Sequence, residues 1–135
     1  MCPVYINRIA SIHAESSNEK PYFSAQEPDY KEMITNANLR RRMSRMIKMG
    51  VACGLECLKD ISPEKVDAII TATGLGCLAD TEKFMNALMD NREQMLNPTA
   101  FIQSTFNTVG AQIALLLKIH AYNCLLYTSP SPRDG

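Results

Sequence analysis

A glycine-rich run at residues 74–79 is the clearest candidate for chemistry in the sequence. Gly74-Leu75-Gly76-Cys77-Leu78-Ala79 fits the G-x-G-x-x-G/A dinucleotide-binding pattern and lies between a predicted strand and a predicted helix, as that pattern requires. A dinucleotide unit also needs a second parallel strand soon afterwards, with an acidic residue about 20 positions on. The chain instead enters a polar loop at Pro98. The run therefore favours a tight turn, with nucleotide binding as the alternative, and the missing Walker lysine excludes a P-loop.

Cysteine and histidine side chains could supply a nucleophile or a metal site. Cys77 follows the glycine turn near a predicted helix N-terminus, where a thiolate would be favoured, but no histidine base is close in sequence. Cys53 and Cys57 lie four positions apart on one predicted helix face, close enough for joint metal ligation. No second ligand pair has matching spacing, so both are expected in the core. His13 and His120 have no partner motif and are expected to be structural or exposed.

Five of the 14 basic residues lie within nine positions of the chain. They are Arg40, Arg41, Arg42, Arg45 and Lys48. On a helix they would form a basic patch near its N-terminal end, where the helix dipole disfavours positive charge. The patch is either a solvated face or a docking surface for an acidic partner.

An α/β unit is expected to position the glycine turn. Residues 66–73 are β-rich and mostly apolar, which predicts a strand covered on both faces, as in a parallel sheet. Asp80 or Thr81 is predicted to cap a helix over residues 82–91. Strand, glycine turn and helix together indicate the α/β class.

The sequence before this unit predicts a strand, a long connection and a helix. Residues 4–12 are β-branched and aromatic and predict a first strand. Residues 14–38 read as a polar connection with one short helix near residues 29–35. Apolar residues recur three and four apart over residues 39–58, which predicts an amphipathic helix. The helix ends before Pro63, because proline disfavours the helical conformation in the residue that precedes it.

The sequence after the unit predicts one further helix. Residues 97–107 are expected to be irregular, and a last helix is expected from about Thr108 to Ala121. These elements supply too few strands for a finished sheet, and no internal repeat is visible.

Length and composition describe one soluble domain. The chain has 135 residues and a formal net charge of zero, so it has no overall field to attract nucleic acid or an anionic membrane. No apolar stretch approaches the roughly 20 residues of a membrane span, and the N-terminus lacks the pattern of a secretory signal. The five cysteines form an odd set without a CxxC motif, which predicts reduced thiols and a cytoplasmic location.

Composition changes abruptly after Asn123. Residues 124–134 match, residue for residue, the in-frame translation of a transposase sequencing adapter. We therefore expect residues 124–135 to be an artefactual or disordered tail and exclude them from fold reasoning. Residues 1–123 are then expected to be a truncated native segment, because such an adapter stands where a sequencing read ended.

The order of the motifs resembles a known family. A helix with Arg42-Met43-Ser44, the strand at residues 66–70, the turn at residues 73–76 and the stretch 97–114 follow one another. Together they resemble the N-terminal half of β-ketoacyl synthases of the thiolase-like superfamily. The resemblance covers almost all of residues 1–123. It is nearest to the compact synthase-like proteins of bacterial lipid, polyketide and aryl-polyene gene clusters.

The resemblance implies an α/β fold, an incomplete thiolase-like layer in which a sheet packs with helices. The full-length parent would condense an acyl chain, held as a thioester on cysteine, with malonyl-acyl carrier protein, without a metal or nucleotide cofactor. The strand that carries the nucleophile would start at about Asn123, so the nucleophile and two later histidines are missing. No catalytic residue is carried over to this chain, and we expect it to be inactive as given. Phe106 stands where relatives are expected to have histidine.

The resemblance also implies partners. Acyl carrier proteins are strongly acidic, which makes the basic patch at residues 40–48 a candidate docking surface. The parent is expected to form a homodimer, or a heterodimer with a synthase paralogue that lacks the nucleophile. Five residues are expected at the active-site floor or the dimer loop: Phe101, Gln103, Thr105, Phe106 and Asn107.

Two alternatives to the synthase segment stay open at this point: a small dinucleotide-binding module and an interaction protein. In a small dinucleotide-binding module, a parallel strand beside residues 66–73 would end in an acidic residue. In a synthase segment, residues 98–107 would be buried and the last helix would lie against the sheet. The second alternative is an interaction protein that uses exposed apolar surface.

Overall fold

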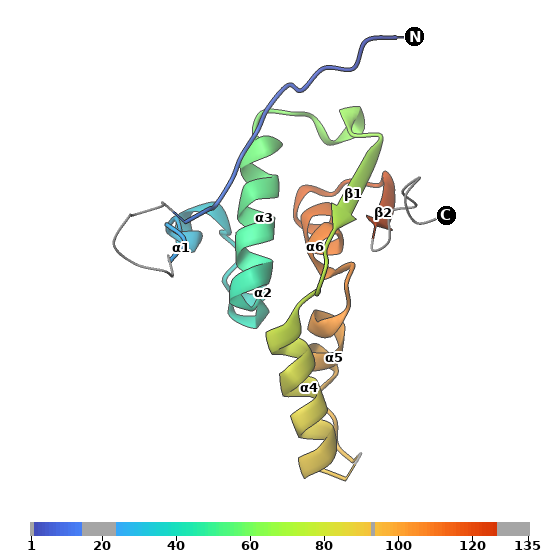
Figure 1. Cartoon of the computed structure of the whole chain (residues 1–135). Coiled ribbons are helices and arrows are strands. Elements are labelled where there is room, and N and C mark those ends of the chain that lie inside the picture. The colour runs from blue at the N-terminus through green and yellow to red at the C-terminus, as the bar shows by residue number, and fades with distance from the viewer. Residues whose placement is uncertain (1, 15–23, 93, 127–135) are drawn as a thin grey trace, which may run out of the picture.

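The computed structural model describes residues 2–14, 24–92 and 94–126, and its elements form a small parallel sheet with helices packed on it. Helix α6 lies between helix α3 and the sheet, and α4 and α5 extend together away from this body (Figure 1). The α/β class predicted from the sequence is confirmed. In chain order the elements are α1 (Tyr30–Met33), α2 (Ala37–Arg42), α3 (Arg45–Cys57), a 3₁₀ turn (Pro63–Lys65), β1 (Ala68–Ala72), α4 (Leu78–Asp90), α5 (Pro98–Ser104), α6 (Thr108–Leu117) and β2 (Tyr122–Leu126).

Helix α3 is the centre of the core. Its Ile47 and Val51, one turn apart, are fully buried and pack with Ile34, Met43 and Ile113. This burial confirms the amphipathic helix that the apolar spacing predicts.

Two glycines bring α6 close to α3. A Cβ at Gly50 would lie 2.7 Å from Val109 Cγ1, and a Cβ at Gly54 would overlap Ile113 Cδ1. The distance between packed helices depends on the side chains at the contact. Glycine at both positions therefore lets the branched side chains of α6 reach the α3 backbone.

The sheet contains β1 and β2 in parallel, from Ala68 opposite Tyr122 to Ala72 opposite Leu126. Alternate residues of β1 are half-buried, on the side where α6 contacts the strand. Ile70 belongs to the other set and is 68% exposed. The prediction that both faces of this strand are covered is therefore wrong for the described residues.

Residues 4–12 do not form the predicted first strand. They run as an extended segment past the end of α3 (Figure 1), and Val4, Tyr5, Ile6 and Ile9 are each at least 75% exposed. No described strand pairs with this segment, so its high β propensity has no ladder to join. Arg8 of this segment donates to the Lys59 carbonyl and lies 3.8 Å from Asp60.

The predicted helix over residues 39–58 is two helices. Met43 adopts an extended conformation, with ψ at 133°, and separates α2 from α3. Its side chain is 4% exposed and packs in the core, so burial of Met43 accompanies the break. The short helix predicted near residues 29–35 is present as α1, where the Asp29 carboxylate accepts from the Lys31 N–H at 2.8 Å.

The predicted boundaries after β1 also need correction. Helix α4 starts at Leu78 with Cys77 as its N-cap, so neither Asp80 nor Thr81 caps it. Residues 97–107 are not irregular, because they contain α5. The Asn97 side chain caps α5, and Pro98 takes its first position.

Helix α6 and the following strand complete the described chain. The helix ends at Leu117 rather than near residue 121, since Lys118 turns into the left-handed region with φ of 54°. Cys124, Leu125 and Leu126 belong to β2, so the expected boundary after Asn123 falls inside a strand. The rest of the expected tail, residues 127–135, lies outside the described residues.

Within the described ranges, no single helix has the length and apolar composition to cross a membrane. Helices α5 and α6 pass that test only as a pair, and they are bent by 104° at their junction.

Candidate functional site

The glycine turn after β1 is built around an aromatic ring. Gly76 has φ of +63°, and its N–H donates to Thr73 Oγ1 at 2.9 Å. The ring of Phe106 occupies the space that a Cβ of Gly76 would need, whereas a Cβ at Gly74 would have no neighbour within 4 Å. Gly76 is therefore required by its backbone conformation and by Phe106, which gives the run a packing role.

The features that would mark a dinucleotide site are not assembled among the described residues. Strand β2 does lie parallel beside β1, but Tyr122-Asn123-Cys124-Leu125-Leu126 contains no acidic residue to hold a ribose. Helix α6 lies against the sheet, which is the arrangement expected of a synthase segment. The loop part of that expectation is only half met, because Gln103 is buried while Phe101 and Phe106 are more than half exposed.

The structure places Cys77 where a thiolate is disfavoured. Its side chain is 5% exposed. Burial, and then the nearby charge of Asp80, raises the pKa of the Cys77 thiol. The prediction that this helix N-terminus favours a thiolate is therefore wrong. Burial also raises the pKa of Cys53, which lies half-buried with Cys57 on α3.

The two histidines lie apart from any nucleophile or metal cluster in the described part of the chain. His13 Nδ1 lies 3.2 Å from Ser11 Oγ in the N-terminal segment. His120 is exposed and lines a cavity with Pro63 and Lys118. The described residues contain no group of three or more His, Cys, Asp or Glu side chains that could hold a metal ion.

The basic patch is divided between α2 and α3. Arg40 donates to the Ile34 carbonyl, and Lys48 is half-buried. Arg41 and Arg42 lie in the last turn of α2, are exposed, and form no ion pair within the described ranges. These two arginines are the part of the predicted patch that is available to a partner.

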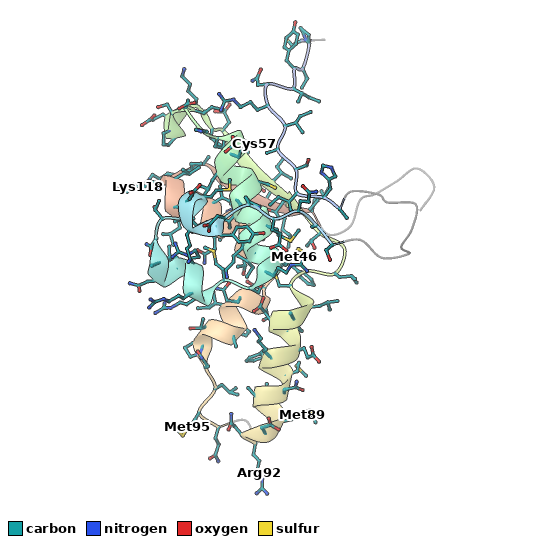
Figure 2. The ribbon with its side chains drawn as sticks, turned by 90° about the vertical axis from the view of Figure 1, so that its left-hand side faces the viewer. Met46, Cys57, Met89, Arg92, Met95 and Lys118 are labelled. Atoms are coloured by element: carbon teal, nitrogen blue, oxygen red, sulfur yellow. The ribbon has the colours of Figure 1, made fainter. Side chains whose placement is uncertain are left out.

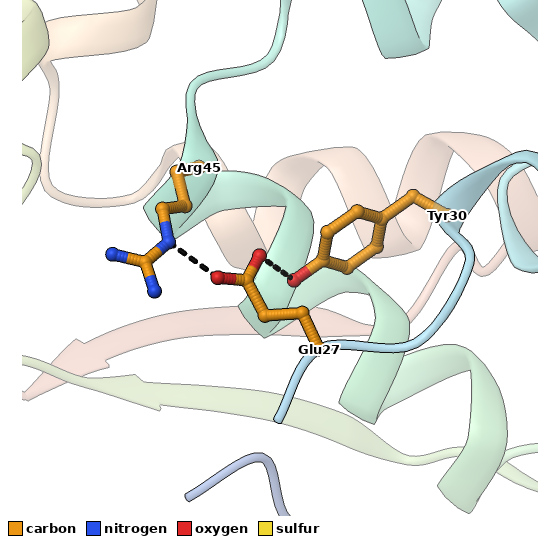
Figure 3. A network of polar contacts seen from close by, with 3 residues as sticks. All are labelled: Glu27, Tyr30 and Arg45. Atoms are coloured by element: carbon orange, nitrogen blue, oxygen red, sulfur yellow. Dashed lines mark hydrogen bonds and ion pairs between the residues drawn. The ribbon is translucent and has the colours of Figure 1, made fainter. Parts of the chain in front are cut away.

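Arg45 takes part in an internal network at the start of α3. Its Nε donates to Glu27 Oε1, and the Tyr30 hydroxyl donates to Glu27 Oε2 at 2.6 Å (Figure 3). The Tyr30 hydrogen bond, followed by the Arg45 contact, lowers the pKa of Glu27. Burial and the Glu27 contact raise the pKa of Tyr30. Arg45 therefore ties the segment before α1 to α3.

Helix α5 carries the predicted dimer-loop residues. The Phe101 ring packs on Phe84 of α4 with ring centroids 5.4 Å apart. Gln103 is 5% exposed, and its Oε1 has no hydrogen-bond partner among the described residues. Thr105 Oγ1 lies 2.9 Å from Thr108 Oγ1, which closes the junction between α5 and α6.

Phe106 and Asn107 complete this set at the start of α6. Phe106 packs on Gly76 on one side yet remains 51% exposed. Asn107 is the N-cap of α6 but makes no side-chain cap hydrogen bond. The predicted set is thus gathered at one junction, with apolar rings that are only partly covered.

A cavity that the sequence did not predict lies between the N-termini of α3 and α4. It has a volume of about 300 Å³, and Ser44 and Asp80 are among its lining residues. These two positions are 36 residues apart, so spacing alone gave no signal that they meet.

Comparisons with known proteins give one family, and 32 chains of solved structures also match. The family model of the β-ketoacyl synthase N-terminal domain matches residues 13–128. A structure titled as a ketosynthase (ApeO) in complex with its chain length factor (ApeC), from Xenorhabdus doucetiae, has a TM-score of 0.61 at 22% identity. The match covers 79% of this chain and 41% of that chain. No curated protein matches. The fold expected from the motif order, a thiolase-like layer of sheet and helices, is confirmed.

The contact between Gly76 and Phe106 gives a direct test of the turn. Gly76→Ala is expected to lower the free energy of unfolding by about 1–3 kcal/mol, because alanine is strained at positive φ and its methyl displaces the Phe106 ring. Urea denaturation followed by circular dichroism measures the change. Gly74→Ala is the matched control, and its free energy of unfolding is expected to stay within about 1 kcal/mol of that of the unmodified chain. Equal losses in the two variants would contradict the packing role of Gly76.

Proposed function

Because this chain belongs to the β-ketoacyl synthase family, we propose that it is the N-terminal segment of a β-ketoacyl-acyl carrier protein synthase-like protein. The observation that carries the proposal is the match of the N-terminal domain model to residues 13–128. In the proposed reaction of the full-length parent, a thioester-bound acyl carbon forms a bond with C2 of a malonyl group. Carbon dioxide leaves the malonyl group, and the nucleophilic thiol is released. The parent would serve fatty acid, polyketide or aryl-polyene biosynthesis in the cytoplasm.

We propose that the chain by itself does not catalyse this condensation. Neither Cys77 nor Cys53 is an activated nucleophile, because Cys77 is buried and burial raises the pKa of both thiols. A second role, that of a non-catalytic partner subunit, is supported by the same fold. The structural neighbour is itself a ketosynthase in complex with its chain length factor.

The absence of acyl transfer can be measured directly. We expect the chain, incubated with an acyl thioester and malonyl-acyl carrier protein, to gain no acyl adduct and to form no 3-oxoacyl product. Intact-protein and peptide mass spectrometry check this. Cys2 is exposed, so the assay uses a Cys2→Ser chain to remove nonspecific acylation. An adduct on Cys77 that disappears in Cys77→Ser would refute the proposal.

We propose that the C-terminal end of α2 docks the acidic carrier protein. The support is the pair of exposed guanidinium groups of Arg41 and Arg42, which form no ion pair with any described residue. Complementary charge raises the rate of encounter and is screened by salt. Arg45 is a poor probe of this surface, because reversing its charge would place two carboxylates together at Glu27.

Charge reversal tests the docking surface. Arg41→Glu with Arg42→Glu is expected to weaken carrier-protein binding about tenfold at low salt, since two exposed pairs are each worth up to about 1 kcal/mol. The difference should shrink in 0.5 M salt, and isothermal titration calorimetry measures both conditions. Arg92→Glu is the control, because Arg92 lies at the far tip of the α4–α5 arm (Figure 2). Unchanged affinity in the double variant, or an equal loss in the control, would reject this surface.

We propose that α5 and its junction with α6 pair with a second copy of the chain or with a synthase paralogue. Phe101, Ile102 and Phe106 are 54%, 54% and 51% exposed. Aromatic and aliphatic side chains gathered in this way are typical of subunit interfaces.

Ile102 offers a clean probe of pairing, because the Phe101 ring also packs on Phe84. Ile102→Glu is expected to weaken self-association at least about tenfold, because it places a charge in an apolar contact. Size-exclusion chromatography with light scattering measures the mass against concentration. Met95→Glu is the control, since Met95 is 96% exposed and lies at the tip of the arm (Figure 2). The assignment would be overturned by the same association in Ile102→Glu, or by an unmodified chain that stays monomeric both alone and with a synthase paralogue.

A further inference from the structure

A groove with an apolar strip lies between α2 and the C-terminal end of α6. Leu39 of α2, with Leu115 and Leu116 of α6, forms the strip, and the volume of the groove is about 590 Å³. This volume is within the range of ligand pockets. Leu39 and Leu116 are half-buried, whereas Leu115 is 62% exposed. The strip is therefore open to a ligand from solvent.

Two positively charged side chains line the same groove. Arg42 is the last residue of α2, and Lys118 is the C-cap of α6. Both are exposed, and neither forms an ion pair with any described residue. The other polar residues of the lining are Asn36 and Asn38, which are uncharged. A ligand therefore reaches two cations and meets no carboxylate among the described residues that line the groove.

The net charge of the groove suits a single negative charge. Helices α2 and α6 both end at the groove, and a helix C-terminus carries up to about half a negative charge. The two C-termini together offset about one of the two cations. Glu64 and Asp67 line a neighbouring cavity with Lys118, but neither forms an ion pair with it. About one positive charge is therefore left for a ligand.

A ligand with two different parts matches this lining. A small inorganic anion would leave the leucines in water, and an uncharged hydrocarbon would not use the positive charge. Burial of an alkyl chain against leucine is favourable without directional contacts. A carboxylate accepts hydrogen bonds from both guanidinium and ammonium groups. An alkyl chain that ends in one carboxylate therefore satisfies both parts of the groove.

We propose that this groove binds a free monoanionic amphiphile, an unbranched alkyl chain with one terminal carboxylate. The carboxylate accepts from Arg42 and Lys118, and the chain lies along Leu39, Leu115 and Leu116. The proposal is independent of the synthase assignment, because it rests on the lining residues and their charges. Its test needs no carrier protein, so it also stands or falls separately from the docking surface at Arg42.

Three probes of one chain length test the head group on the full chain. Octanoate, 1-octanol and octylammonium share an alkyl chain and differ in the charge of the head group. With ¹³C-methyl-labelled leucine, nuclear magnetic resonance should show saturable shifts of Leu115 and Leu116 with octanoate. Leu88 of α4 should not move. At low salt, octanoate is expected to bind about fivefold more tightly than 1-octanol, the share of an exposed charge pair, and octylammonium most weakly.

A pair of matched variants assigns the charge to the groove. Lys118→Gln is expected to weaken octanoate binding about threefold and to leave 1-octanol binding unchanged. Lys83→Gln, at an exposed position of α4, is the control and should change neither affinity. The three probes on the unmodified chain decide the question even if Lys118→Gln does not fold.

Four results would overturn the proposal. They are absent saturation by octanoate, equal affinities for octanoate and octylammonium, and the same loss in Lys118→Gln and Lys83→Gln. The fourth is binding to phosphatidylglycerol vesicles without saturable octanoate shifts, because it would assign the groove to a lipid surface instead of a free anion.

Discussion

The fold depends on how closely α6 fits between α3 and the sheet. On the α3 side, Gly50 and Gly54 leave room for branched side chains of α6. On the sheet side, a Cβ at Gly110 would lie 2.5 Å from Thr71 Oγ1 and 3.0 Å from Asn123 Oδ1. Glycine on both sides of one helix sets the spacing of the three layers, because any larger residue would push them apart. The position of the glycine turn, and of everything attached to it, follows from this spacing.

Sequence periodicity predicted the elements whose buried residues recur at regular spacing along the element itself. The apolar spacing of α3 and the β-rich run around β1 gave the α/β class, since each pattern repeats with the period of its element. Residues 4–12 failed because a strand needs a neighbour, and propensity does not supply one. The prediction of one continuous helix failed at Met43, where the chain leaves the helical conformation and the side chain is buried in the core. Helix α5 was missed although Asn97-Pro98 is a helix-start signal.

Features of the candidate site also divide into those that local sequence predicts and those that depend on distant contacts. Residues 74–76 were correctly predicted as a turn, but its cause is Phe106, 30 positions away, which spacing does not reveal. The basic patch was visible as composition, whereas the ion pair that removes Arg45 from it depends on the segment at Glu27. The burial of Cys77 likewise comes from tertiary packing. The sequence therefore predicted which chemical groups are present, but not which of them are exposed and unpaired in the fold.

The extended N-terminal segment affects how the chain behaves before it meets a partner. Val4, Tyr5, Ile6 and Ile9 combine strong β propensity with almost complete exposure, and their backbone joins no described ladder. Such a segment is a template for pairing with any open strand edge, including that of another copy. Arg8 is the one charged residue within residues 4–12, so it is the residue of this segment that opposes such pairing.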